Sequence, residues 1–173
     1  MLKQIFTRKK LSGFSLLEIM AVVAIVAIAL VGTTKLVVQS LRAQQVNRST
    51  IIAYQLAQEG VELVRYIRDT NWLQARDWDE GMELGEYCLD YLSPELILAA
   101  DLNDCQLYLN NDNHYYHPRN SPELDEETIF KRKIEILSLP YSAPSLGVRI
   151  SISWFEGGMD NNYILETELF DWK

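Results

Sequence analysis

The chain has 173 residues, with 24 Asp and Glu against 16 Lys and Arg, so its net charge at pH 7 is −8. This acidic balance favours solubility and argues against unaided binding of a nucleic acid backbone, which needs clustered Lys and Arg. The length that remains after an apolar N-terminal stretch suits one modest domain with a single core.

The N-terminal region combines a basic leader with an apolar segment. Residues 1–13 carry no acid and four basic side chains: Lys3, Arg8, Lys9 and Lys10. From Phe14 to Gly32 the chain has nineteen residues and one charge, Glu18, which is close to the ~20 apolar residues of a membrane-spanning helix. We expect a single-pass protein of the cytoplasmic (inner) membrane, because the basic leader stays cytoplasmic while the C-terminal domain lies outside.

Glu18 is the unusual residue of this segment. A carboxylate inside a membrane helix costs roughly 2.5 to 3.5 kcal/mol near the centre, less near the end, so it is a functional-site hypothesis by default. A buried acid and a buried ammonium offset one another when they pair. The residue therefore predicts a cationic partner.

The run Gly13-Phe14-Ser15-Leu16-Leu17-Glu18 resembles the N-terminal signature of type IV pilins and of the pseudopilins of type II secretion and competence systems. The resemblance implies that a prepilin peptidase cuts between Gly13 and Phe14 and methylates the new amine of Phe14. It also implies that Glu18 meets the Phe14 ammonium of a neighbouring subunit and sets the axial register of a filament. Loss of the leader's four basic residues would lower the net charge by four, to −12.

Partners follow from the same resemblance. They are the prepilin peptidase, other pilin or pseudopilin subunits, an inner-membrane assembly platform and the lipid bilayer. Nucleic acid is not expected as a partner. DNA uptake, which some such filaments support, would need a local patch such as Lys131, Arg132 and Lys133, whose middle residue points to the opposite sheet face from the other two.

Two other interpretations of the N-terminus fit its residues less well. A secretory signal peptide needs a small-x-small cleavage site after a shorter apolar core, and Gly32-Thr33-Thr34-Lys35-Leu36 offers no convincing one. A plain single-span anchor for an external domain would gain nothing from Glu18 or from Gly13-Phe14.

Apolar residues continue at helical spacing from residue 33 to Asp69, with charged and polar residues between them. This pattern predicts an amphipathic extension of the membrane helix, whose apolar stripe packs on a sheet. Gly60 indicates close packing against that sheet. Gly32, followed by Thr33 and Thr34, is a place where the helix could loosen, although no proline is present to kink it.

Residues 70–128 lose clear periodicity and predict a long, variable, loop-rich connection with a short helix near Pro94 to Ala100. Cys88 and Cys105, the only cysteines, lie in this connection. A disulfide is possible in the external compartment. Two free thiols or a metal pair are the alternatives, although the spacing is not a zinc pattern.

We find no catalytic constellation and expect neither an enzyme nor a cofactor. His114 and His117 have the spacing H-x-x-H among Asn and Asp residues, which makes a metal site conceivable. A solvated loop explains them better, so no metal site is predicted.

Residues 129–173 predict an antiparallel sheet. Alternation is clear in 130–136 and 148–154 and weaker from Tyr163 to Trp172. On the middle strand we expect one face to meet the helix: Val148, Ile150, Ile152 and Trp154. The turn around Gly157-Gly158 predicts a hairpin with a loop longer than two residues.

Together these features predict an α+β, pilin-like fold: a long N-terminal helix packed on a three- to four-stranded antiparallel sheet. The expected segments are a leader (1–13), a transmembrane or filament-core helix (14–32), its amphipathic extension (33–69), the connection (70–128) and the sheet (129–173). The segment from Tyr54 to Trp72 is similar to minor pilins of the PilV type and to related pseudopilins. The alternative function is a membrane-anchored binding or adhesion module that does not polymerise and uses the tyrosine-rich segment from Tyr87 to Tyr116.

Overall fold

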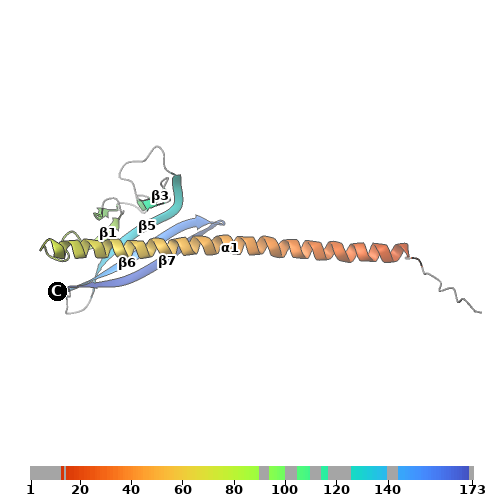
Figure 1. The fold of residues 1–173 in the computed structure, drawn as a ribbon, viewed down its shortest axis with the longest axis horizontal. Helices are drawn as coiled ribbons and strands as arrows, with labels where there is room; N and C mark the ends of the chain where they lie inside the picture. Colours follow the sequence, from red (N-terminus) through yellow and green to blue (C-terminus); the bar gives the residue numbers. More distant parts are fainter. Residues whose placement is uncertain are drawn as a thin grey trace, which may run out of the picture. The chain divides into compact units, whose positions relative to one another are not determined.

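The computed structural model describes residues 13, 15–89, 94–99, 105–109, 114–116, 126–139 and 144–171. Within them it has one helix, α1 (Leu16–Leu73), and seven strands (Figure 1). The strands are β1 (Gly85–Cys88), β2 (Ile97–Leu98), β3 (Gln106–Leu109), β4 (Tyr115–Tyr116), β5 (Glu126–Ser138), β6 (Ser145–Glu156) and β7 (Met159–Phe170). The chain divides into two compact units, residues 1–45 and 46–173.

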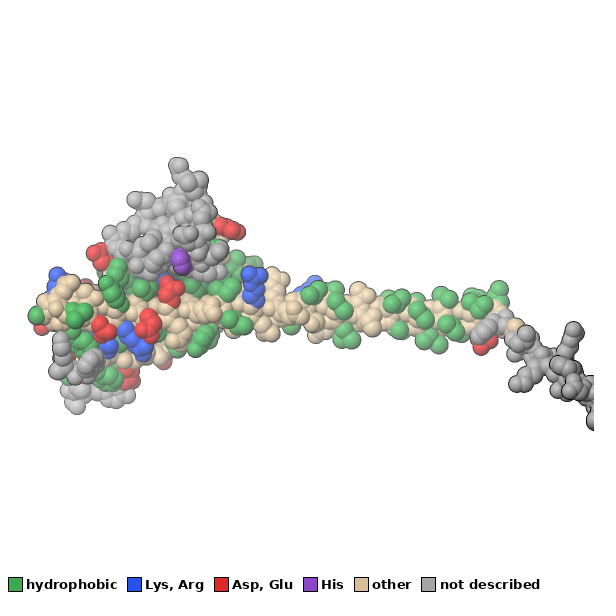
Figure 2. Space-filling view, viewed as in Figure 1, with side chains coloured by type: hydrophobic (Ala, Val, Ile, Leu, Met, Phe, Trp, Pro, Cys, Tyr) green, Lys and Arg blue, Asp and Glu red, His purple; other side chains and the backbone are tan. Residues whose placement is uncertain are grey.

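The first unit contains the N-terminal part of α1. Every residue from Leu16 to Gln45 is exposed, and Figure 2 shows hydrophobic side chains along this part of the helix. The helix continues through Gly32, where the hydroxyls of Thr33 and Thr34 both donate to the carbonyl of Leu30, at 3.0 and 2.8 Å. From Ile19 to Val31 the helix is apolar on all sides. Such a helix is normally buried in protein or in a membrane, so this part needs an environment that the unit does not supply.

In the second unit, the remainder of α1 packs on the sheet. Its buried residues recur every three or four positions: Ala53, Leu56, Ala57, Gly60, Val61 and Val64. They meet the buried residues of β5 and β6: Phe130, Ile134, Ile136, Val148, Ile150, Ile152 and Trp154. The predicted α+β layout of a long helix on an antiparallel sheet is therefore confirmed, with seven strands among the described residues where three to four were expected. The expected inward face of β6 is the buried one. The helix ends at Leu73, four residues beyond the expected end.

Gly60 lies where the helix comes closest to the sheet. A Cβ at this position would lie 3.0 Å from Cδ1 of Ile150 and 3.4 Å from Cδ of Arg132. The prediction of close packing at Gly60 is confirmed. The absence of a side chain here outweighs the roughly 1 kcal/mol that glycine costs in a helix interior, because an added methyl group would push against β6 and β5.

The C-terminal end of α1 is closed by a Schellman motif. The amide of Ala75 donates to the carbonyl of Trp72 at 3.1 Å, and the amide of Arg76 donates to the carbonyl of Asn71 at 2.9 Å. Ala75 takes the left-handed position with φ 54°, which glycine usually occupies. The Asn71 side chain, itself buried, donates to the carbonyls of Trp78 and Glu80 and fixes the chain that follows.

Replacing Ala75 by glycine is expected to raise the free energy of unfolding by about 1 kcal/mol, because the left-handed conformation strains an alanine and not a glycine. Urea unfolding of the full chain in a non-ionic detergent measures the change. Ala57→Gly, the same substitution in the buried helix interior, is the control and should destabilise. Equal effects of the two substitutions would contradict the expectation.

The main sheet consists of β5, β6 and β7, and neighbouring strands are antiparallel. The pairing of β6 with β7 runs without a break from Glu156 opposite Met159 to Ser145 opposite Phe170. The hairpin between β6 and β7 has only Gly157 and Gly158 in its loop, with φ 65° and 82°. The prediction of a longer loop was wrong. Two successive residues with positive φ form a type I′ turn, whose twist matches the flanking strands.

Four short strands come from the segment that we expected to be loop-rich. β1 and β3 both pair with β5, with Tyr87 opposite Ile134 and Gln106 opposite Lys131. They lie end to end along the edge of β5 that β6 leaves free. The short helix expected near Pro94 to Ala100 is wrong for the described residues 94–99, where β2 pairs with β1 instead.

Candidate functional site

The N-terminal segment that the sequence singles out begins α1. The carbonyl of Ser15 accepts hydrogen bonds from the amides of Glu18 and Ile19, at 3.0 and 3.2 Å, so Ser15 occupies the N-cap position and Glu18 the third helical position. Ser and Glu at this spacing form the pattern of a capping box, which sequence reasoning missed although the letters S-x-x-E show it. Phe14 lies outside the described residues, and Gly13 is exposed.

Glu18 is placed to interact with a cation. It lies in the first turn of α1 and is exposed, where the partial positive charge of the helix N-terminus stabilises a carboxylate. No other charged residue occurs in the sequence until Lys35. The first unit thus presents one acid at the beginning of a long apolar surface.

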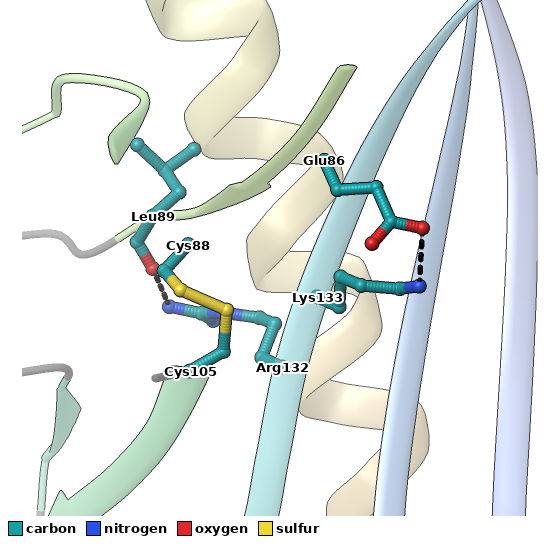
Figure 3. The surroundings of a disulfide bond; sticks show 6 residues. All are labelled: Glu86, Cys88, Leu89, Cys105, Arg132 and Lys133. Atoms are coloured by element: carbon teal, nitrogen blue, oxygen red, sulfur yellow. Dashed lines mark hydrogen bonds and ion pairs between the residues drawn. A yellow bond between two sulfur atoms is a disulfide. The ribbon is translucent and has the colours of Figure 1, made fainter. Parts of the chain in front are cut away.

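A second cluster joins three elements of the second unit around Arg132 of β5 (Figure 3). The Arg132 side chain is fully buried; its guanidinium donates to the carbonyl of Leu89 at 2.9 Å and to the carbonyl of Leu56 in α1 at 3.3 Å. It also lies 3.1 Å from the carboxylate of Glu59, which is 37% exposed. The sequence placed this residue on the opposite face from its neighbours, and the structure agrees.

A disulfide closes the junction between β1 and β3. Cys88 at the end of β1 and Cys105 just before β3 are bonded, with their Cα atoms 5.1 Å apart, and both are buried. Because β1 and β3 lie end to end beside β5, the bond joins two pieces that act as one interrupted edge strand. The Leu89 carbonyl that Arg132 binds follows directly after Cys88, so both interactions hold the same point of the chain.

Replacing both cysteines by alanine is expected to lower the free energy of unfolding by about 3 kcal/mol, the value of a loop of this length in the chain-entropy model. Urea unfolding of oxidised protein measures it. Reduction of the unmodified chain should reproduce the loss, whereas the same reductant should leave the double variant unchanged. A double variant as stable as the oxidised parent would show that the bond contributes nothing.

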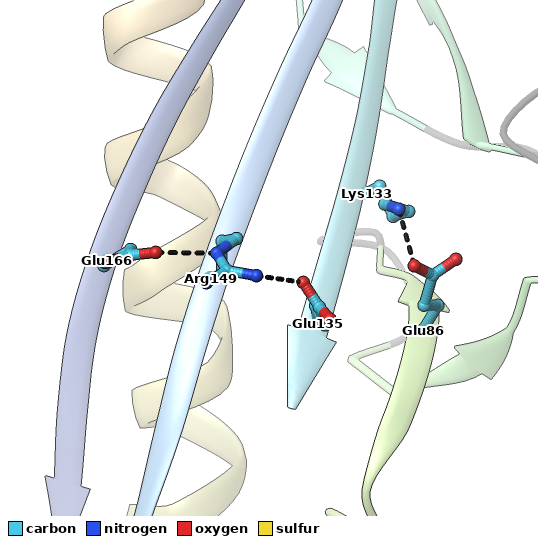
Figure 4. A network of polar contacts seen from close by, with 5 residues as sticks. All are labelled: Glu86, Lys133, Glu135, Arg149 and Glu166. Atoms are coloured by element: carbon cyan, nitrogen blue, oxygen red, sulfur yellow. Dashed lines mark hydrogen bonds and ion pairs between the residues drawn. The ribbon is translucent and has the colours of Figure 1, made fainter. Parts of the chain in front are cut away.

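The outer face of the sheet carries a row of charged pairs (Figure 4). Arg149 of β6 contacts Glu166 of β7 at 2.6 Å and Glu135 of β5 at 2.8 Å, while Lys133 contacts Glu86 of β1 at 2.7 Å. The hydrogen bonds to Glu166 and then to Glu135 raise the pKa of Arg149 above its usual value. These partly exposed pairs fix cross-strand register more than they add stability.

Tyr87 of β1 is buried, and its side chain contacts the loop that precedes the strand. Its hydroxyl donates to the carbonyl of Glu83 at 3.0 Å. Burial, followed by the negative charge of Glu83, raises the pKa of the Tyr87 phenol. The side chain therefore stays neutral and serves the packing of β1.

The remaining candidate residues do not assemble into a site in the part of the chain that the structure describes. His114 is exposed, and His117 lies outside the described residues. No group of three or more His, Cys, Asp and Glu that could hold a metal is present among the residues with described positions. Lys131 and Lys133 face outward while Arg132 is buried, so these three residues do not form one basic patch.

Comparison with protein-family models matches residues 8–34 to the prokaryotic N-terminal methylation motif. The chain therefore carries the processing signal of type IV pilins and pseudopilins, a class of structural proteins. Comparison with the curated proteins gave no match, and comparison with the solved structures gave none. Helix α1, which begins within the matched residues, is long and apolar enough to cross a membrane.

Proposed function

We propose that the chain is a prepilin-type structural subunit that a prepilin peptidase processes between Gly13 and Phe14 and that then enters a filament. The observation that carries this proposal is the match of residues 8–34 to the methylation motif on a helix whose first thirty residues, Leu16 to Gln45, are all exposed. Such a surface suits lipid before assembly and neighbouring helices afterwards.

Membrane insertion precedes assembly in this proposal. The basic leader keeps the N-terminus cytoplasmic, and the domain formed by residues 46–173 lies outside the inner membrane. The Cys88–Cys105 disulfide suits an oxidising external compartment. The filament is a type IV pilus, a type II secretion pseudopilus or a competence pseudopilus, in which we assign the chain a minor-subunit role through its similarity to PilV-type pilins.

Mass spectrometry of the N-terminal peptide from protein recovered from native membranes tests the proposal. We expect a mature chain that begins with N-methylated Phe14. An intact leader, or cleavage near Thr33, would instead identify an anchored or secreted domain. The alternative, an anchored adhesion module that uses the segment from Tyr87 to Tyr116, predicts surface display with no incorporation into filaments.

A further inference from the structure

Strand β7 forms a long free edge of the sheet. Among the described residues it pairs only with β6, and in Figure 4 it lies at one end of the row of strands that carry the charged pairs. The type I′ turn directs the Met159 amide toward β6. Since ladder bonds alternate along an antiparallel strand, the amides and carbonyls of the even-numbered residues from Asp160 to Phe170 point to the free edge.

Apart from its acidic side chains, this edge lacks the devices that usually prevent strand pairing. Natural edge strands are short, bulged, or marked by Lys or Pro. β7 is 12 residues long, has no register shift and contains neither Lys nor Pro. It also exposes apolar side chains, with Met159 64%, Ile164 50% and Phe170 41% exposed. A strand of this kind is an aggregation site unless something covers it.

The charges beside the edge indicate what covers it. Asp160, Glu166 and Glu168 share the outer face with Ile164, and only Glu166 is paired, with Arg149. A second β7 would bring the same three acids onto the same face, and like charges on facing strands are destabilising. Lys or Arg on a partner strand would neutralise them instead.

We propose that β7 binds an extended segment of a different polypeptide chain by antiparallel β-strand addition. The segment places Lys or Arg beside Glu166 and Glu168 and an apolar residue beside Ile164. Main-chain bonds supply the affinity, and these alternate side chains supply the specificity. The inference does not rest on filament assembly, because an anchored module would present the same edge.

A designed peptide tests the pairing. The probe is fluorescein-labelled Lys-Thr-Lys-Val-Val-Val-Thr-Thr-Lys with blocked ends, titrated with the full chain in a non-ionic detergent and followed by fluorescence anisotropy. Ile164→Pro removes one outward amide and no bond to β6, so we expect it to weaken binding about tenfold or more. Ile164→Thr keeps the amide and is the matched control, and a probe with Glu in place of Lys should bind far more weakly.

Amide hydrogen exchange on the unmodified chain provides a measurement that does not depend on how the proline variant folds. The probe should slow exchange at the edge-facing amides of Ile164, Glu166 and Glu168 and leave the β6-bonded amides between them unchanged. Equal binding by the two Ile164 variants, no saturable binding, or no selective protection would overturn the proposal. Self-association of the chain that Ile164→Pro abolishes would also overturn it, since the occupant would then be a second copy.

Discussion

Replacing Arg132 by alanine is expected to lower the free energy of unfolding of the second unit by about 3–5 kcal/mol. The guanidinium is buried between β5, α1 and the residue after β1, and it donates to the carbonyls of Leu89 and Leu56. Alanine would leave the Leu89 carbonyl without this donor, remove the partner of Glu59 and open a cavity under Gly60. The first change loosens the segment after β1, and the other two act on the contact between helix and sheet.

Arg132→Met separates the polar role from the space that the side chain fills. Methionine retains most of the volume, so we expect a smaller loss of about 1–3 kcal/mol from the unpaired carbonyl. Arg149→Ala, on the exposed face of the next strand, is the control and should have a much smaller effect. Urea unfolding of the full chain in a non-ionic detergent measures all three. If Arg132→Ala were no more harmful than Arg149→Ala, Arg132 would not hold the three elements together.

The regular elements were predictable because their residues repeat. The strict alternation through Ile150 and Ile152 identified the inward face of β6, and the helical stripe with its glycine at position 60 identified the contact with the sheet. Strands of two to four residues carry too few positions to show a period. β1 and β3 form because they pair with β5 and because Cys88 is bonded to Cys105.

Two further features, the bounds of the β6–β7 turn and the partners of Arg132, could not be predicted from local sequence patterns. Asp160-Asn161-Asn162 has the composition of a turn, but Gly157 and Gly158 alone complete the hairpin, so these polar residues belong to β7. The role of Arg132 depends on the Leu89 carbonyl, 43 positions away in the chain. Alternation placed its side chain on the inner face, and no local pattern could indicate its partners.

The candidate processing site, in contrast, could be predicted almost entirely from residues that are close together in the sequence. Gly13, Phe14 and Glu18 are recognised by their spacing to a basic leader and an apolar run, and the motif match covers the same residues. The structure adds that Ser15 begins the helix and that Glu18 lies exposed in its first turn. Both facts place the one acid at the start of the helix, four positions after Phe14 in the sequence.

Replacing Glu18 by alanine is expected to abolish incorporation of the chain into filaments while the protein still inserts into the membrane. An ammonium at Phe14 that leaves water needs an anion, and an unpaired buried charge costs several kcal/mol, so neighbouring helices would lose the interaction that fixes their axial register. Sheared filament fractions and membrane fractions, compared by immunoblot, measure the effect.

The isosteric Glu18→Gln should fail as completely as alanine if the negative charge is the requirement, whereas Glu18→Asp should retain part of the incorporation. Glu62→Ala, which removes an exposed acid from the same helix and its pair with Arg65, is the matched control and should assemble normally. Normal assembly of Glu18→Gln would assign this residue to helix capping, where a neutral amide serves as well as a carboxylate, and would remove the electrostatic basis for register in the proposed filament.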